Sequence, residues 1–116
     1  MKALIVDDEE DICFLLSGIL RQKQLTTAYV TNLREARKSL EIDVPSIVFL
    51  DNHLPDGFGL DFIKHLKSNY PSTKVVMITA HDGPLERKTA AKEGADLFIS
   101  KPFTREIIED ALSQLT

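Results

Sequence analysis

The sequence predicts an α/β fold with helices on both faces of a parallel β-sheet. Short apolar runs alternate with amphipathic segments along the whole chain, a pattern typical of β-α units. The runs at residues 4–6, 47–50 and 75–78 are apolar without interruption, as expected for strands that are covered on both sides. Because there are five alternations, we expect residues 1–116 to form one domain, a doubly wound three-layer sandwich.

The expected strands lie at residues 3–6, 26–30, 47–50, 75–78 and 97–99. The helix between the first two strands is predicted from apolar residues that recur on one helical face: Ile12, Leu15, Leu16, Ile19 and Leu20. Three later helices are predicted from the same spacing: Leu33, Ala36 and Leu40; Phe62, Ile63 and Leu66; Ile108, Ala111, Leu112 and Leu115.

The segment at residues 84–92 differs from the other predicted helices. Its only apolar residues are Leu85, Ala90 and Ala91, so this helix is expected to bury little surface and to be loosely held. Gly94 follows in a position suited to cap its C-terminus.

Composition and charge exclude several classes of protein. A net charge of −4 and a pI near 5.3 argue against direct binding to nucleic acids, which requires a basic face. No apolar stretch approaches the roughly 20 residues that cross a bilayer, and the N-terminus lacks the features of a signal peptide. The single cysteine, Cys13, suits a reducing cytoplasm and is expected to be a small buried hydrophobic residue.

Side chains that can carry chemistry follow the ends of four predicted strands. They are Asp7 and Asp8 after the first strand, Asp51 after the third, Thr79 after the fourth and Lys101 after the fifth. Open parallel sheets place their functional groups just beyond the carboxyl ends of the strands. If the strand at 26–30 lies at the edge of the sheet, these groups converge in one crevice.

The converging charges indicate a divalent cation. Three carboxylates close together raise one another's pKa unless a cation offsets them, and Lys101 supplies only one positive charge. Oxygen ligands without a converging His or Cys favour Mg²⁺ or Mn²⁺ over zinc. Asp7 and Asp8 come as a pair, as metal ligands often do, whereas the acidic residues 9–11 are expected to start the next helix and interact with its dipole.

A carboxylate beside Mg²⁺ and a lysine is also equipped to accept a phosphoryl group. Transfer depends mainly on positioning and on neutralising the charge of the phosphoryl oxygens. Mg²⁺ and Lys101 would neutralise that charge, and Thr79 could donate a hydrogen bond. Asp51 is the expected nucleophile because it stands alone at the end of a central strand.

Four short motifs lie at these strand ends: Asp7-Asp8, Asp51 followed by Leu54-Pro55-Asp56-Gly57, Thr79-Ala80, and Lys101-Pro102-Phe103. In this order they resemble the receiver domain of bacterial two-component response regulators, and the resemblance covers the whole chain. It implies a flavodoxin-like sheet of strand order 2-1-3-4-5. It also implies that Asp51 accepts a phosphoryl group from a phosphohistidine on a sensor histidine kinase or a phosphotransfer protein.

The resemblance assigns further roles to individual residues. The metal ligands would be Asp8, Asp51, the backbone carbonyl of His53 and, through water, Asp7. Thr79 and Lys101 would contact the phosphoryl group. Phe98 occupies the position of an aromatic residue that turns inward on activation.

In this family the signalling face is built from the fourth helix, the fifth strand and the fifth helix. The resemblance therefore gives the loosely held helix at 84–92 a purpose. Phosphorylation would change this face and control an output, such as transcription, through a domain outside these residues; a homodimer through the same face is one assembly it allows. Such a protein is a switch that catalyses its own phosphorylation and dephosphorylation rather than a turnover enzyme. The Lys101-Pro102 bond is expected to be cis.

Several positions need separate interpretation. His53 and His81 each lie two residues beyond a site residue, where related domains modulate the lifetime of the acyl phosphate by controlling the approach of water; two solvated loop histidines are the alternative. His65 lies on a predicted helix and is expected to be exposed. Gln24 stands where glycine commonly closes the first helix, so the turn is expected to form without the easy positive φ of glycine.

Three other functions share features with the receiver but fit the sequence less well. A haloacid-dehalogenase-like phosphatase uses similar chemistry, but its acidic pair follows the lysine, whereas here the pair comes first. A flavodoxin-like cofactor carrier needs a phosphate-cradling loop after the first strand, and the acidic residues 7–10 would repel a phosphate. A degenerate receiver used only for docking would not need the complete acidic site.

Overall fold

The computed structural model describes residues 1–81 and 83–115. Its main sheet has five parallel strands: β1 (Lys2–Val6), β2 (Thr26–Val30), β3 (Ile47–Leu50), β6 (Lys74–Thr79) and β7 (Leu97–Ser100). Their spatial order is β2-β1-β3-β6-β7, which is the predicted order 2-1-3-4-5 when only these five strands are counted. The predicted α/β fold is therefore confirmed.

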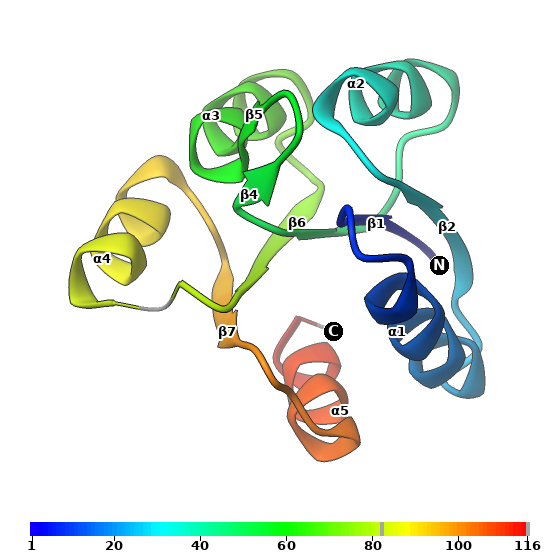
Figure 1. Cartoon of the computed structure of the whole chain (residues 1–116). Coiled ribbons are helices and arrows are strands. Elements are labelled where there is room, and N and C mark those ends of the chain that lie inside the picture. Colours follow the sequence, from blue (N-terminus) through cyan, green and yellow to red (C-terminus); the bar gives the residue numbers. More distant parts are fainter. Residues whose placement is uncertain (82, 116) are drawn as a thin grey trace.

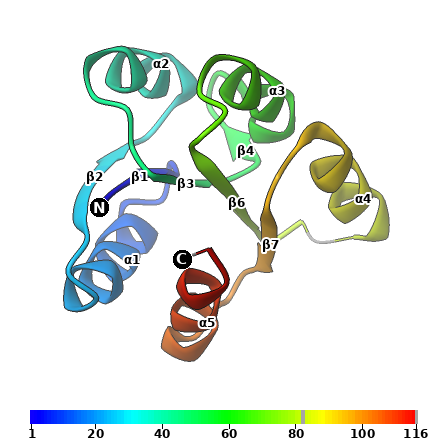
Figure 2. The same cartoon turned by 180° about the vertical axis from the view of Figure 1, so that it is seen from behind.

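Five helices cover the two faces of this sheet. They are α1 (Glu10–Gln22), α2 (Leu33–Ile42), α3 (Gly59–Asn69), α4 (Pro84–Glu93) and α5 (Arg105–Leu115). Helices α1 and α5 lie on one face, and α2, α3 and α4 lie on the other (Figure 1). The opposite view shows the same three layers (Figure 2).

The layers enclose two hydrophobic cores, because successive side chains of a strand point to opposite faces of the sheet. Ile5 and Phe49 belong to the core beneath α1 and α5. Leu4 and Leu50 belong to the core beneath α2, α3 and α4. The strands β1 and β3 are thus buried on both sides, as their uninterrupted apolar runs predicted.

Helix α1 buries a slightly different face from the one predicted. Leu16, Ile19 and Leu20 are buried as expected, but Leu15 is 53% exposed. Cys13 is buried in its place, which confirms the prediction that this cysteine is a buried residue. The apolar spacing identified the helix correctly but included one residue from its solvent side.

The turn after α1 uses a left-handed residue despite the absence of glycine. Gln24 has φ of 68°, so the expectation that this turn forms without a positive φ is wrong. The turn is closed by hydrogen bonds from the Gln24 N–H to the Arg21 carbonyl and from the Leu25 N–H to the Leu20 carbonyl. These bonds satisfy carbonyl groups at the end of the helix and hold Gln24 in an otherwise unfavourable conformation.

A two-stranded hairpin, β4 (His53–Leu54) and β5 (Gly57–Phe58), lies outside the main sheet and was not predicted. Asp56 at its tip accepts hydrogen bonds from the backbone N–H groups of Leu33 and Arg34, at 2.8 Å and 3.0 Å. The carboxylate therefore binds the N-terminus of α2, where the first N–H groups have no partner within the helix. The tip of the hairpin is thereby joined to α2.

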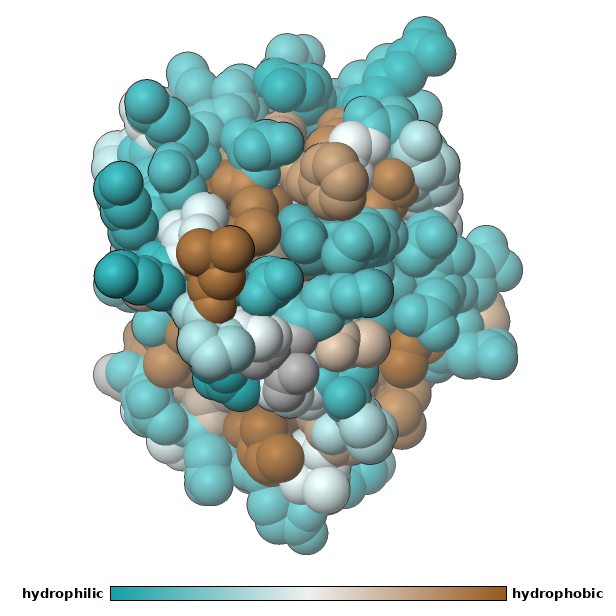
Figure 3. Space-filling model, turned by 60° about the vertical axis from the view of Figure 1, so that its left-hand side comes forward, coloured by the Kyte–Doolittle hydropathy of each residue, from teal (hydrophilic) through white to brown (hydrophobic). Residues whose placement is uncertain are grey.

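Helix α4 buries little surface, as predicted. Ala90 is its only buried residue, and Leu85 is 72% exposed. The side of the molecule that carries α4 is mainly hydrophilic, with small separate hydrophobic patches (Figure 3). Gly94 ends the helix with φ of 114°, and its N–H donates to the Ala90 and Ala91 carbonyls, so the predicted glycine cap is confirmed.

Within the described ranges 1–81 and 83–115, none of the helices has both the length and the apolar character needed to cross a membrane.

Candidate functional site

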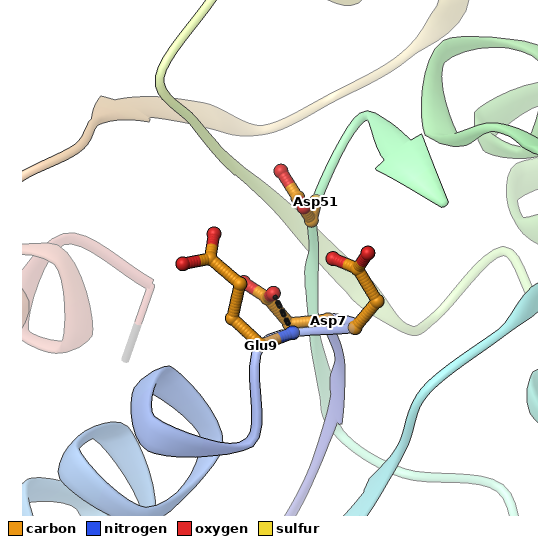
Figure 4. Close-up of side chains that lie close together, drawn as sticks. Asp7, Glu9 and Asp51 are labelled. Atoms are coloured by element: carbon orange, nitrogen blue, oxygen red, sulfur yellow. Dashed lines mark hydrogen bonds between the residues drawn. The ribbon is translucent and has the colours of Figure 1, made fainter. Parts of the chain in front are cut away.

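The register of the sheet brings two buried carboxylates side by side. Val6 and Leu50 are paired at the ends of β1 and β3, and an aspartate follows each of them directly. The Asp51 N–H continues the ladder by donating to the Val6 carbonyl at 2.9 Å. The side chains of Asp7, Glu9 and Asp51 therefore point into one region beyond the strand ends (Figure 4).

Lys101 reaches the same place from the end of β7, an edge strand of the sheet. It follows β7, and its N–H donates to the Thr79 carbonyl at the end of β6. Its Nζ atom lies 2.8 Å from Asp7 Oδ2, 3.1 Å from Glu9 Oε1 and 3.6 Å from Asp51 Oδ2. One ammonium group thus contacts three carboxylates, and the predicted convergence of Asp7, Asp51 and Lys101 is observed.

Burial changes the acidity of the two aspartates. Burial, reinforced by the charge of Asp7, raises the pKa of Asp51 to about 6, although Lys101 and the Asn52 N–H act to lower it. Burial likewise raises the pKa of Asp7, against the effect of its hydrogen bonds from Lys101 and from the Glu9 N–H. With a pKa of about 6, the Asp51 carboxyl group is still mostly ionised at neutral pH.

The lysine is held in its charged form by the same cluster. Burial acts to lower the pKa of Lys101, but its hydrogen bond with Asp7 and the charges of Asp51 and Asp7 outweigh burial and raise it. Lys101 is thus a fixed positive charge beside the Asp51 carboxylate.

The acidic groups outnumber the cation. Oxygen atoms of Asp7, Asp8, Glu9 and Asp51 all lie within 4.8 Å of one another. Asp7 and Asp51 are buried, whereas Asp8 and Glu9 are exposed at the rim of a hollow of about 290 Å³. Four carboxylates around one ammonium group leave excess negative charge, and a set of oxygen atoms of this kind fits a hard divalent cation.

Glu9 is the member of this cluster that sequence reasoning missed. It was expected to serve only the helix dipole with the acidic residues after it. In the structure it precedes α1, and its carboxylate accepts a hydrogen bond from Lys101. No sequence signal distinguishes Glu9 from Glu10, because the direction of the Glu9 side chain depends on the position of Lys101 at the end of β7.

Asn52 is a second residue that the sequence did not identify. It is 5% exposed, and its N–H donates to Asp51 Oδ1 at 2.9 Å. Its side-chain oxygen accepts from the Leu60 N–H, and its carbonyl accepts from the Gly59 N–H. Asn52 therefore joins the Asp51 carboxylate to the N-terminus of α3.

Gly59 is required by this close packing. A Cβ atom at Gly59 would lie 2.2 Å from the Asp51 carbonyl oxygen, which is a forbidden contact with backbone. Glycine thus allows α3 to begin directly against the strand end that carries Asp51.

The remaining predicted site residues surround the acidic cluster at different depths. Thr79 is 1% exposed, and its Oγ1 accepts a hydrogen bond from the His81 N–H at 3.1 Å. His53 and His81 are exposed at the mouth of the hollow, where their ring centroids lie 3.8 Å apart. Phe98 lies on β7, outside the acidic cluster, with its ring half-buried against the core beneath α4. The Lys101-Pro102 bond is cis, as expected.

His65 is not simply exposed, so that expectation is wrong. It is half-buried, and its ring stacks on Phe62 with centroids 5.2 Å apart. Its Nδ1 lies within reach of both Arg37 and Asn69. Burial and the charge of Arg37 lower the pKa of His65. The ring packs on α3 and faces Arg37 of α2.

Comparisons with known proteins agree with the fold and the strand-end motifs. The chain matches the model of the response regulator receiver domain over residues 3–113. It is 40% identical over 115 residues to the response regulator protein PilR of Pseudomonas aeruginosa, an alignment that covers 96% of this chain and 26% of PilR. It is 34% identical over 105 residues to the phosphate regulon transcriptional regulatory protein PhoB of Escherichia coli, covering 89% of this chain and 46% of PhoB. The chain thus spans less than half the length of these relatives.

Solved structures give the same result. The receiver domain of NtrX from Brucella abortus superimposes with a TM-score of 0.90 at 31% identity, covering 97% of this chain and 96% of that one. The beryllofluoride-activated NtrC4 receiver domain dimer has a TM-score of 0.90 at 35% identity, covering 99% and 98%. The chain belongs to the receiver domain family of two-component response regulators, and the resemblance seen in its strand-end motifs is confirmed.

Proposed function

We propose that residues 1–116 act as a phosphorylation switch in which Asp51 accepts a phosphoryl group from a phosphohistidine on a sensor histidine kinase or phosphotransfer protein. The observation that carries this proposal is the position of Asp51 at the floor of an acidic hollow, 3.6 Å from the ammonium group of Lys101. This arrangement provides an ionised nucleophile and a fixed positive charge for the phosphoryl oxygens.

The donor set supports binding of Mg²⁺ or Mn²⁺ at the same place. Asp8, Asp51 and the backbone carbonyl of His53 would hold the ion, with Asp7 acting through water. When bound, a divalent cation neutralises charge on the phosphoryl oxygens. The excess of carboxylates in the cluster supports this assignment, because Lys101 alone leaves it negative.

The chain's own groups account for the transfer. A carboxylate oxygen of Asp51 forms the new bond to phosphorus as the bond to the donor imidazole nitrogen breaks, and the electron pair stays with the imidazole. Lys101 stabilises the negative charge on the oxygens, and the Thr79 hydroxyl donates a hydrogen bond to one of them. Water then hydrolyses the acyl phosphate, which releases inorganic phosphate and restores the free carboxylate of Asp51.

The signal would be passed on by the face of the domain formed by α4, β7 and α5. Phe98 would turn inward when Thr79 engages the phosphoryl group, and the face formed by α4, β7 and α5 would change with it. The similar NtrC4 receiver domain is a dimer when activated by beryllofluoride, which supports a homodimer through this face as one form of output. PhoB is a transcriptional regulator, which supports control of transcription through residues beyond this chain. The domain itself, with a net charge of −4, would work in the cytoplasm without binding nucleic acid.

The receiver function is favoured over the phosphatase alternative. The family model that matches is that of receivers, and the order of the motifs along the chain is theirs. A phosphatase would hydrolyse a phosphomonoester continuously, whereas a receiver forms an adduct at one residue.

The proposal is tested by incubating the protein with Mg²⁺ and acetyl phosphate. We expect one phosphoryl group per chain, located at Asp51 by mass spectrometry, and no adduct in Asp51→Asn. Asp61→Asn, which alters an exposed aspartate in the first turn of α3, serves as the matched control and should label normally. Labelling that persists in Asp51→Asn, or continuous release of phosphate from a phosphomonoester, would contradict the proposal.

His53 and His81 are proposed to set how long the acyl phosphate lasts. Their rings contact each other at the mouth of the hollow, where water must enter to reach Asp51. Replacing both by alanine should change the rate of dephosphorylation without abolishing phosphorylation. The decay of the labelled protein measures this rate, and an unchanged decay would leave them as two solvated loop histidines.

A further inference from the structure

Arg87 of α4 reaches across to two residues of β7. Its guanidinium carbon lies 4.7 Å from the centroid of the Phe98 ring, a cation–π contact. Its Nη2 donates a hydrogen bond to Ser100 Oγ at 2.7 Å. Phe98 and Ser100 are two positions apart on a strand, so both side chains lie on the face of the sheet that α4 covers.

The planar shape of the guanidinium group permits both contacts at once. One face can lie over the aromatic ring while an edge donates a hydrogen bond, an arrangement that a lysine ammonium cannot reproduce. The Phe98 ring therefore has two kinds of contact. It packs against the core beneath α2, α3 and α4, and Arg87 lies over it.

This link lies close to the acidic cluster. Ser100 is paired with Thr79 in the register of β7 and β6, and Lys101 comes next along the chain. Helix α4 has Ala90 as its one buried side chain among the residues described. The contacts of Arg87 with Phe98 and Ser100 therefore join α4 directly to the strand that precedes Lys101.

We infer that Arg87 is a positioning residue that holds Phe98 in the orientation seen here and so opposes the switch. This inference rests on the proposed function, in which Phe98 turns inward. In that function the ring would turn from Arg87, an exposed residue of α4, toward Thr79, and the cation–π contact would be lost. Removing Arg87 should make the switch easier.

The test uses beryllofluoride with Mg²⁺ as a stable mimic of the phosphoryl group and measures the concentration at half-saturation. A 4-fluorophenylalanine label at Phe98, read by fluorine NMR, reports the environment of the ring. In Arg87→Met we expect half-saturation at about one third of the wild-type concentration, from the loss of one exposed cation–π contact. We also expect the fluorine resonance of the unbound variant to move toward its bound position.

Three further variants separate this role from a general effect of charge. Arg87→Lys, which keeps the cation but not its planar shape, should lie between wild type and Arg87→Met. Lys88→Met removes the neighbouring charge, which points about 100° away around the helix, and should not change half-saturation. In a Phe98→Leu background, which has no ring, Arg87→Met should have no further effect.

The outcomes distinguish this inference from the proposed function. Failure of the wild-type protein to saturate with beryllofluoride and Mg²⁺ would overturn the proposed function and this inference with it. Normal saturation with unchanged or weaker binding in Arg87→Met would overturn the inference alone. So would an equal effect of Lys88→Met, or an effect of Arg87→Met that persists without the Phe98 ring.

Discussion

Helices α1 and α4 adjoin the same site but are attached to the sheet in different ways. Helix α1 has 13 residues and buries five of them, namely Cys13, Leu16, Ser17, Ile19 and Leu20. Helix α4 has 10 residues, and Ala90 is the one it buries. The reason lies in their sequences: α1 has a continuous apolar face, whereas α4 is polar on nearly all sides.

The two helices accordingly suit different tasks. Helix α1 starts directly after the acidic residues that follow β1, and its packed face holds that end of the site in place. Helix α4 is held by the Gly94 cap, by its buried Ala90 and by the contacts of Arg87 with β7. A helix with little buried apolar surface can shift at small cost in free energy, which a switch requires.

The largest expected difference between the two helices is in stability. Leu16→Ala removes a side chain that is 1% exposed and should lower the free energy of unfolding by about 3 kcal/mol. Leu85→Ala alters a side chain of α4 that is 72% exposed and should change it by less than about 0.5 kcal/mol. Urea denaturation followed by circular dichroism measures both.

The comparison would fail if Leu85→Ala destabilised the protein as much as Leu16→Ala. That result would mean that α4 is packed as firmly as α1 and cannot shift cheaply. Ile42→Ala, which alters an apolar side chain of α2 that is 85% exposed, is the matched control for truncation at the surface.

Smaller effects, of opposite sign to each other, are expected from a glycine within α1 and from the glycine that caps α4. Gly18 lies within α1, and an added Cβ atom would meet no atom within 4 Å. Gly18→Ala should therefore stabilise the protein by up to about 1 kcal/mol through better helix propensity. Gly94 has φ of 114°, so Gly94→Ala should destabilise it by about 1 kcal/mol or more.

The same denaturation experiment tests this pair. Gly94→Ala should also reduce the helical signal of α4 if the glycine cap is an important attachment of that helix. An unchanged free energy of unfolding in Gly94→Ala would show that the cap contributes little, and the attachment of α4 would then depend on Arg87 and Ala90.

Much of the site could be predicted because it depends on strand ends. Asp7, Asp51, Thr79 and Lys101 each follow or end an apolar run, and parallel strands bring such residues to one edge of the sheet. The strand order that makes them neighbours came from the resemblance to receivers. The structure places these residues where that order requires.

The contacts of Glu9 and Asn52 could not be predicted in the same way. Glu9 joins the cluster because its carboxylate accepts a hydrogen bond from Lys101, 92 residues away. Asn52 contacts α3 because Gly59 allows a close approach to the Asp51 carbonyl. Neither contact has a local pattern, since each depends on how separate segments meet.

The amino-acid sequence by itself determined which segments are strands and helices, which carboxylates and which lysine stand at the strand ends, and which helix lacks an apolar face. These properties depend on the order and spacing of residues along one segment. Only the tertiary structure decided that Glu9 shares Lys101, that Gln24 adopts a left-handed conformation, and that Arg87 stacks on Phe98. The contacts of Glu9 and Arg87 arise from the packing of distant segments, whose side chains choose among several allowed directions only when their neighbours are in place. The conformation of Gln24 depends on the hydrogen bonds that close the turn after α1.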